Sequence, residues 1–341
     1  MRNFGKIILI FIITMMFSAN SAFSLDVDLD LDDLQQTANK FVDSMAISLP
    51  FNSTMGLNWS DAYIGQLFAV PPHLGVGITA GFTTMEFGAV NKMLERFNVS
   101  LPAGFNWGGF PLPGYTAELR IGGIVLPFDL GVKFGVLDLK EDFWDTIKLG
   151  DIDFSMNYLL IGGDLRYALL GKKKKSIIKI AIGVGFNYMR GGLSLPVPDI
   201  SLDFGSANPL EISDSYLNLL WETKSLDFKA QASFSLAFIT PYVGLGVSHA
   251  WSSAGYGLFA KEDIQVNNND ITTTIINELQ TQGLTSITSK GLVYRSDVNG
   301  WSFRAYAGFS INVPFVRFDL TAMYDFLSQN YGATFGTRFQ L

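Results

Sequence analysis

The chain contains no cysteine and only two histidines, His73 and His249. Without cysteine there is no disulfide framework, no thiol chemistry and no lipid-anchored N-terminal cysteine. Two histidines alone also offer a poor ligand set for a transition metal, because such sites use several His and Cys side chains together. The sequence therefore predicts no bound metal and no other cofactor.

No apolar run is long enough for a membrane helix. Residues 7–17 are apolar except for Thr14, which is roughly half of the ~20 residues that a spanning helix needs. This run follows Arg2 and Lys6 and precedes Ala22-Phe23-Ser24, a cleavage site of small residues. The pattern predicts a secretory signal peptide over residues 1–24, which is cleaved on export and takes no part in the fold.

Positive charge is also scarce. The formal net charge is −7, and subtracting the two positive charges of Arg2 and Lys6 makes it −9. No basic stripe is present to contact phosphates, so we expect no nucleic-acid partner. Charged residues are 16% of the chain and hydrophobic residues 48%. Two classes of exported protein fit this composition: a soluble β-rich domain and a membrane β-barrel.

The last eleven residues, 331–341, favour the barrel. Their side chains alternate between an aromatic-rich face and a face of Gly, Thr, Arg and Gln. The first face holds Tyr331, Ala333, Phe335, Thr337, Phe339 and Leu341; the second holds Gly332, Thr334, Gly336, Arg338 and Gln340. Such a strand is typical of the closing strand of an outer-membrane barrel, where one face meets lipid and the other a polar lumen. We therefore expect location in the outer membrane, contact with its lipid, and recognition of this strand by the barrel-assembly machinery.

Period-two alternation recurs along the rest of the chain. It predicts an all-β fold, a transmembrane antiparallel up-and-down β-barrel of about ten strands, over residues 73–341. Twelve strands are the alternative, because residues 45–51 also alternate and residues 193–222 have room for a hairpin. The ten segments are roughly 74–87, 115–126, 128–139, 154–170, 178–189, 226–238, 242–256, 301–313, 315–327 and 331–341.

The connections between these segments fall into two kinds. Four are short: three are centred on Pro127, Pro241 and Pro314, and the fourth is residues 171–175. Proline cannot donate to a strand ladder and belongs at strand ends and turns. The other connections are mostly long, over about 88–113, 140–153, 190–224 and 258–300. With a periplasmic C-terminus, the four short turns lie in the periplasm and the long loops outside.

Residues 25–72 do not show barrel alternation. After an acidic start at 26–33, apolar residues recur at helical spacing from Leu31 to Met45. This predicts an amphipathic helix of about four turns that either plugs the lumen or rests against the periplasmic mouth. Calcium binding by the acidic start is disfavoured, because it lacks the glycine and distal glutamate of an EF-hand loop.

Short motifs in this segment carry a resemblance. They are T-A-N-K-F at 37–41, M-G-L-N-W at 55–59 and H-L-G-V-G-I at 73–78, together with the turn L-P-F-D-L at 126–130. They are similar to those of an uncharacterised family of exported outer-membrane β-barrel proteins of diderm bacteria, with an acidic N-terminal helix, a G-x-N-x-W stretch and an aromatic C-terminal strand. The resemblance implies a membrane barrel and supplies no activity or catalytic residue.

Charged residues of inward parity mark the predicted lumen. A lipid-facing Arg or Lys costs roughly 2–4 kcal/mol at mid-bilayer, so these side chains need each other or water. Two interpretations stay open: an internal salt-bridge network that fills the barrel, or a charged lining that selects solutes. The candidates are Glu118, Arg120, Lys133, Asp164, Arg166, Lys179, Asp227, Lys229, Arg304, Arg317, Asp319, Asp325 and Arg338, and Asp129 shares their parity.

No residue pattern points to catalysis. His249 shares a face with Val247 and Trp251, which predicts a place among lipid-facing aromatics, and no supporting motif surrounds it. We therefore expect no enzyme and no catalytic residue. The leading hypothesis is a gated pore or transporter for small solutes with the N-terminal segment as its plug. The alternative is a structural or surface-binding, adhesin-like barrel that uses its outer loops. The ligand, the openness of the lumen and the oligomeric state do not follow from the sequence.

Overall fold

The computed structural model describes residues 31–69, 72–85, 110–139, 155–172, 176–197, 200–202, 210–212, 215–260, 265–266, 269–270, 287–288 and 291–341. The predicted signal peptide, the acidic stretch 26–30 and most of the residues expected to form long loops lie outside these ranges. None of the described helical residues forms a segment long and apolar enough to cross a membrane.

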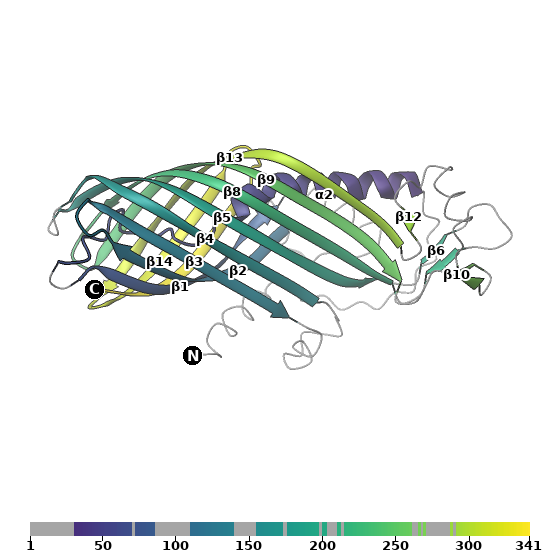
Figure 1. Cartoon of the computed structure of the whole chain (residues 1–341), viewed down its shortest axis with the longest axis horizontal. Coiled ribbons are helices and arrows are strands. Elements are labelled where there is room, and N and C mark those ends of the chain that lie inside the picture. Colours follow the sequence, from purple (N-terminus) through teal and green to yellow (C-terminus); the bar gives the residue numbers. More distant parts are fainter. Residues whose placement is uncertain are drawn as a thin grey trace.

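Ten antiparallel strands form a closed ring (Figure 1). The last strand pairs with the first, Gly75 opposite Gln340, and closes the barrel. The ring confirms the predicted up-and-down barrel of ten strands. In order, it comprises β1 (Leu74–Met85), β2 (Phe110–Gly122), β3 (Phe128–Leu139), β4 (Ser155–Leu170), β5 (Ile178–Val197), β8 (Ser215–Phe234), β9 (Ile239–Ala260), β13 (Gly291–Val313), β14 (Val316–Asp325) and β15 (Tyr331–Gln340).

The twelve-strand alternative is wrong. Residues 45–51 lie in a helix, and the residues of 193–222 nearest the ring extend β5 and β8. Short strands β6 (Ile200–Leu202), β7 (Leu210–Ile212), β10 (Gln265–Val266) and β11 (Asn269–Asp270) form a separate small sheet. A further pair of residues, β12 (Ile287–Thr288), pairs with β13. Alternation alone cannot tell a ring strand from the extension of its neighbour, because both have a period of two.

Strand length differs greatly around the ring. β14 and β15 have 10 residues each, whereas β5 and β8 have 20, β9 has 22 and β13 has 23. Ten extra residues lengthen a strand by about 33 Å. The long strands extend at the end opposite the C-terminus, so one side of the barrel continues as a wall (Figure 1).

The connections after β2, β4, β8 and β13 lie at the other end, beside the C-terminus, where the backbone amide of Leu341 donates to Leu74. The short β14–β15 turn lies at the opposite end. One predicted turn is misplaced. β8 and β9 are joined at 235–238, and Pro241 lies inside β9 opposite Phe309. Its side chain is exposed. The sequence prediction placed the turn at the proline because proline usually ends a strand.

A single long helix precedes the barrel. α2 (Leu31–Asn52) has 22 residues, about six turns rather than the four expected. It packs along the extended wall of β9 and β13, at the end opposite the C-terminus (Figure 1). Its buried face includes Phe41, Val42, Met45 and Leu49, in one apolar cluster with wall residues such as Trp221. The helix therefore does not rest against the mouth beside the C-terminus; its C-terminal half packs against inward-facing side chains of the ring at the opposite end of the lumen.

Candidate functional site

The segment after the helix, residues 53–64, runs through the ring and is buried at every position. We call it the plug. It contains no helix or strand, so its peptide groups need partners from elsewhere. The wall supplies them: the Lys133 ammonium donates to the carbonyls of Ser53 at 2.9 Å and Met55 at 2.5 Å. Further carbonyls on the plug accept from the wall, Leu57 from Arg120 and Lys229, Trp59 and Ser60 from Gln231, Asp61 from Arg166, and Tyr63 from Lys179.

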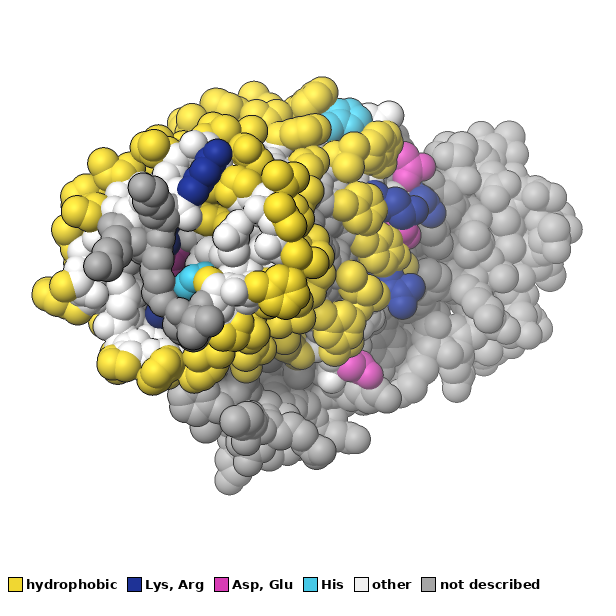
Figure 2. Space-filling view, turned by 60° about the vertical axis from the view of Figure 1, so that its left-hand side comes forward, with side chains coloured by type: hydrophobic (Ala, Val, Ile, Leu, Met, Phe, Trp, Pro, Cys, Tyr) yellow, Lys and Arg dark blue, Asp and Glu magenta, His cyan; other side chains and the backbone are white. Residues whose placement is uncertain are grey.

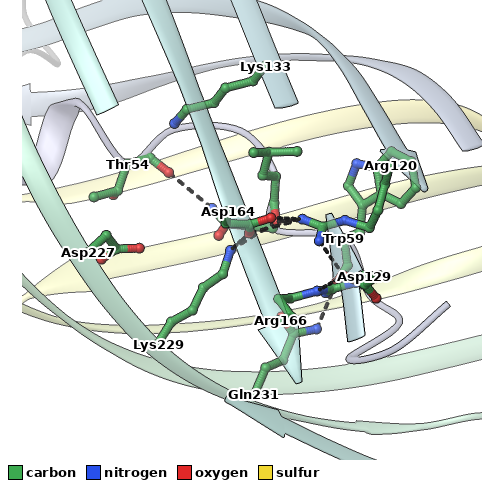
Figure 3. A network of polar contacts seen from close by, with 12 residues as sticks. Thr54, Trp59, Arg120, Asp129, Lys133, Asp164, Arg166, Asp227, Lys229 and Gln231 are labelled. Atoms are coloured by element: carbon green, nitrogen blue, oxygen red, sulfur yellow. Dashed lines mark hydrogen bonds and ion pairs between the residues drawn. The ribbon is translucent and has the colours of Figure 1, made fainter. Parts of the chain in front are cut away.

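One group of ion pairs lies on β2, β3, β4 and β8 beside the plug (Figure 3). Asp129 pairs with Arg120 at 2.6 Å and with Arg166 at 2.8 Å, and all three side chains are at most 1% exposed. Asp164 pairs with Arg120 at 2.8 Å and with Lys229 at 2.5 Å. Buried charges are tolerated only when paired in this way. The plug joins this group through the Ile64 amide, which donates to Asp129.

A second group surrounds Asp61, the only charged residue of the plug. Its carboxylate pairs with Lys179 at 3.3 Å, with Arg338 at 3.2 Å and with Arg317. Gln340 also donates to it at 3.2 Å. Four wall side chains from three strands therefore converge on one carboxylate, which ties the C-terminal end of the plug to the wall.

Arg338 links Asp61 to the barrel wall and to the aromatic part of the plug. It pairs with Asp319 at 2.7 Å, the partner expected from strand parity. Its guanidinium also lies over the ring of Trp59, 4.7 Å from the centroid, and Arg120 lies 5.6 Å from the same ring. The Trp59 indole donates to Glu118. The plug is thus held by a cation–π contact as well as by ion pairs.

A third group lies on β8, β9, β13 and β14. Asp227 pairs with Arg304 at 2.6 Å and accepts from Ser248 at 2.7 Å. Asp325 accepts from Ser302 and from the backbone amides of the β14–β15 turn. All members of this group belong to the wall, so their contacts join neighbouring strands to one another and not to the plug.

The structure places all thirteen predicted lumen residues on the inner side of the ring, and most of them are buried. Sequence reasoning missed Asp61 and Trp59 as members of the site. Their segment has no periodicity, so nothing in the pattern told which way their side chains point. Whether any of the thirteen guides a solute stays a prediction.

The described wall of the lumen carries more positive than negative charge. It has eight cations, namely Arg120, Lys133, Arg166, Lys179, Lys229, Arg304, Arg317 and Arg338, and six carboxylates, namely Glu118, Asp129, Asp164, Asp227, Asp319 and Asp325. Asp61 offsets one of the two surplus charges. Among the described residues no group of three His, Asp or Glu side chains is placed to hold a metal.

His249 lies on the outer face of the barrel. Its ring contacts Trp251 and Trp301 edge-on, with centroids 4.8 and 4.6 Å apart. These contacts agree with the prediction of a lipid-facing aromatic cluster.

Comparison with known proteins supplies a family and a set of similar folds. A family model described as Lsa36-like matches residues 20–341, and no curated protein matches the sequence. Several solved structures resemble the chain at low identity, including the following three. The outer membrane protease OmpT from Escherichia coli is 10% identical with a TM-score of 0.39, over 80% of this chain and 98% of its own.

The other two are a translocator domain and a transporter. The translocator domain of the autotransporter NalP from Neisseria meningitidis is 8% identical with a TM-score of 0.37, over 90% of this chain and 99% of its own. The Pseudomonas putida toluene transporter TodX is 9% identical with a TM-score of 0.27, over 96% of each chain. Likenesses this distant carry no argument about activity.

One expectation needs correction. The sequence led us to expect no enzyme. That expectation is corrected, because the similar folds include a protease, so a barrel fold by itself does not exclude an enzyme. Catalytic groups can sit on loops above a barrel whatever the lumen does. The likeness shows no enzymatic activity for this chain.

Proposed function

The chain belongs to the Lsa36-like family, and on that premise we propose that it is an outer-membrane barrel whose plug closes a pore for small solutes. The observation that carries the proposal is the way the plug is held. Apart from Met55, which packs in the apolar cluster, the plug contacts the wall mainly through polar groups: carbonyls, the amides of Ala62 and Ile64, the Asp61 carboxylate and the Trp59 indole. Each of these polar contacts can be exchanged for water or for a polar solute. A plug that leaves would uncover a lining already suited to water.

The outward side of the ring supports location in a membrane. Large apolar side chains there are exposed on strand after strand, such as Val76, Leu130, Ile182, Leu245 and Phe335. Figure 2 shows them as a nearly continuous apolar surface over the barrel. Soluble monomers rarely expose apolar patches of this extent. An apolar outer band around a charged interior is the pattern of a transmembrane barrel.

The charge of the lining indicates which solutes would pass. With the plug absent, the wall keeps two surplus positive charges. Clear aqueous channels are typical of larger barrels of 16–18 strands, so an opened ring of ten strands is narrow and each lining charge acts at short range. We therefore expect small anions to pass more readily than cations.

Planar-bilayer conductance tests the pore. The full-length mature protein should be silent, and a variant lacking residues 31–64 should carry current with a preference for chloride over potassium. Heat-modifiable gel mobility shows first that the variant is a folded barrel. A folded variant that carries no current would contradict the proposal.

A second candidate function rests on the extended wall. Beyond Trp251 and Trp301, charged side chains appear on the outward face of the wall, with the side chains of Glu222, Arg295 and Asp297 exposed, beside the apolar Leu220. Apolar side chains face lipid and polar ones face water, so this part stands clear of the bilayer. A rigid wall braced from inside by α2 suits a surface that binds a molecule outside the cell.

Both candidate functions require that the α2 end of the barrel faces the outside of the cell. Single introduced cysteines can test this orientation, because the natural sequence contains no cysteine. Lys40 is exposed on α2, and Ala237 is exposed in the β8–β9 turn at the other end. On intact cells, Lys40→Cys should react with a membrane-impermeant maleimide. Ala237→Cys should react only after the outer membrane is permeabilised. The reverse pattern would show that α2 lies in the periplasm.

A further inference from the structure

A pocket of about 520 Å³ opens at the C-terminal end of the barrel, between the end of the plug and the wall. The plug contributes Asp61 and Tyr63 to its lining, and the wall contributes Lys179, Arg317 and Gln340 among others. Figure 2 looks toward this end, where polar side chains lie in a hollow ringed by apolar ones. The volume is in the range of small-molecule sites.

Two buried polar groups that line this pocket lack hydrogen-bond partners among the described residues. They are the hydroxyl of Tyr63, whose residue is 1% exposed, and the side-chain oxygen of Gln340, whose residue is 8% exposed. The large majority of buried side-chain polar atoms have at least one partner. One donor and one acceptor are therefore available to a bound molecule at the place where Asp61 meets the wall.

The cations of the pocket are the accessible ones. The Lys179 side chain is 12% exposed and that of Arg317 is 24% exposed, whereas Arg120, Arg166 and Arg304 are sealed at 0–1%. Lys179 and Arg317 both pair with Asp61 and with no other described carboxylate. Asp61 and Asp319 together thus pair with three cations, Lys179, Arg317 and Arg338, so a further anion would meet a surplus positive charge here.

We propose that this pocket binds a small solute with a carboxylate or phosphate group, and that Asp61 occupies the seat of that group in the closed state. The proposal rests on the pore function and names the solute class that opens it. A bound anion takes Lys179 and Arg317 from Asp61. Arg338 and Gln340 then remain as partners of Asp61, and the attachment of the plug at this end is weakened. Tethered Asp61 has a high effective concentration. The solute gains over Asp61 through the Tyr63 hydroxyl, which can donate to the anionic group, and through the Gln340 side-chain oxygen, which can accept from a donor elsewhere on the solute.

Plug release can be followed without any conductance measurement. Ala62 is fully buried beside Asp61, so the thiol of an Ala62→Cys variant of the mature protein in detergent should react slowly with maleimide. Inorganic phosphate or succinate should raise the labelling rate at least ten-fold and saturably, and the more potent of the two identifies the anionic group. Sodium chloride at matched ionic strength should not, which separates binding from screening.

Two matched variants locate the effect. Lys179→Gln should raise the half-saturating anion concentration about ten-fold. Lys224→Gln, which removes an exposed lysine of the extended wall, should leave it unchanged. Calorimetric titration of the unaltered protein with the same anions provides a measure of binding that does not depend on the introduced cysteine.

Equal labelling in phosphate, succinate and chloride, with no calorimetric signal, would overturn the inference. Binding that leaves the thiol of the Ala62→Cys variant protected would overturn the displacement of Asp61. If anions neither bind nor speed labelling while the plug-deleted barrel conducts, the anion-site proposal is contradicted and the pore proposal is supported. If anions bind while the plug-deleted barrel carries no current, the anion-site proposal is supported and the pore proposal is contradicted.

Discussion

Replacing Asp61 by asparagine should loosen the plug and produce transient anion-preferring openings in planar bilayers, where the unaltered protein is silent. Asp61 is the only carboxylate for Lys179 and Arg317 among the described residues and one of two for Arg338. Removing one partner of a buried ion pair typically costs about 3–5 kcal/mol, because the other charge stays buried without compensation. Lys179 and Arg317 reach water in part, so the lower end of that range applies.

Asp297→Asn is the matched control for this variant. Asp297 pairs with Arg295 on the extended wall, and both side chains are well exposed, at 70% and 67%. Exposed pairs of this kind contribute little. The control should remain silent and unfold at the same temperature as the unaltered protein. A D61N variant that is equally silent and equally stable would show that Asp61 does not hold the plug.

Replacing Asp129 by alanine should have the largest effect on the stability of the barrel itself. Asp129 is fully buried between Arg120 and Arg166. Arg120 keeps Asp164 as a partner, whereas Arg166 loses its only carboxylate among the described residues. We expect the free energy of unfolding to fall by about 3–5 kcal/mol. Denaturant unfolding of the barrel in lipid vesicles, followed by gel mobility, measures the loss.

Two further variants show whether the stranded arginine is the cause. Asp138→Ala changes an exposed carboxylate on the same strand and should leave unfolding unchanged. Arg166→Met in the Asp129→Ala background should recover part of the loss, because it removes the uncompensated charge. If the double variant is less stable than Asp129→Ala alone, the cost comes from the hydrogen bond to the Ile64 amide and from packing instead.

The barrel could be predicted because its cause is local. A strand in a membrane ring must alternate between lipid and lumen, and that requirement is written into each segment separately. The odd or even position of a residue within its strand then predicted which way its side chain points, as the Arg338–Asp319 pair illustrates. Prediction failed where a short stretch fits both the strand and the helix period: residues 45–51 alternate, yet they lie near the end of α2.

Only the wall side of the candidate site could be predicted from the sequence. The inward charges of the wall follow from parity, but the plug has no regular backbone and no period. Asp61 meets Gln340 across 279 residues and Lys179 across 118. No local pattern encodes such a meeting, since it depends on where the chain enters the ring and how deep it runs.

The ten strands, their two faces and the charged interior follow from the order of residues, because every strand must place apolar side chains toward lipid and polar side chains toward the lumen. The place of α2 on the extended wall, the passage of residues 53–64 through the lumen and the convergence of three cations on Asp61 follow only once the ring has closed. A closed ring creates an interior in which distant charges must be neutralised together. Wall carboxylates neutralise most of the cations, and the plug adds one carboxylate, Asp61.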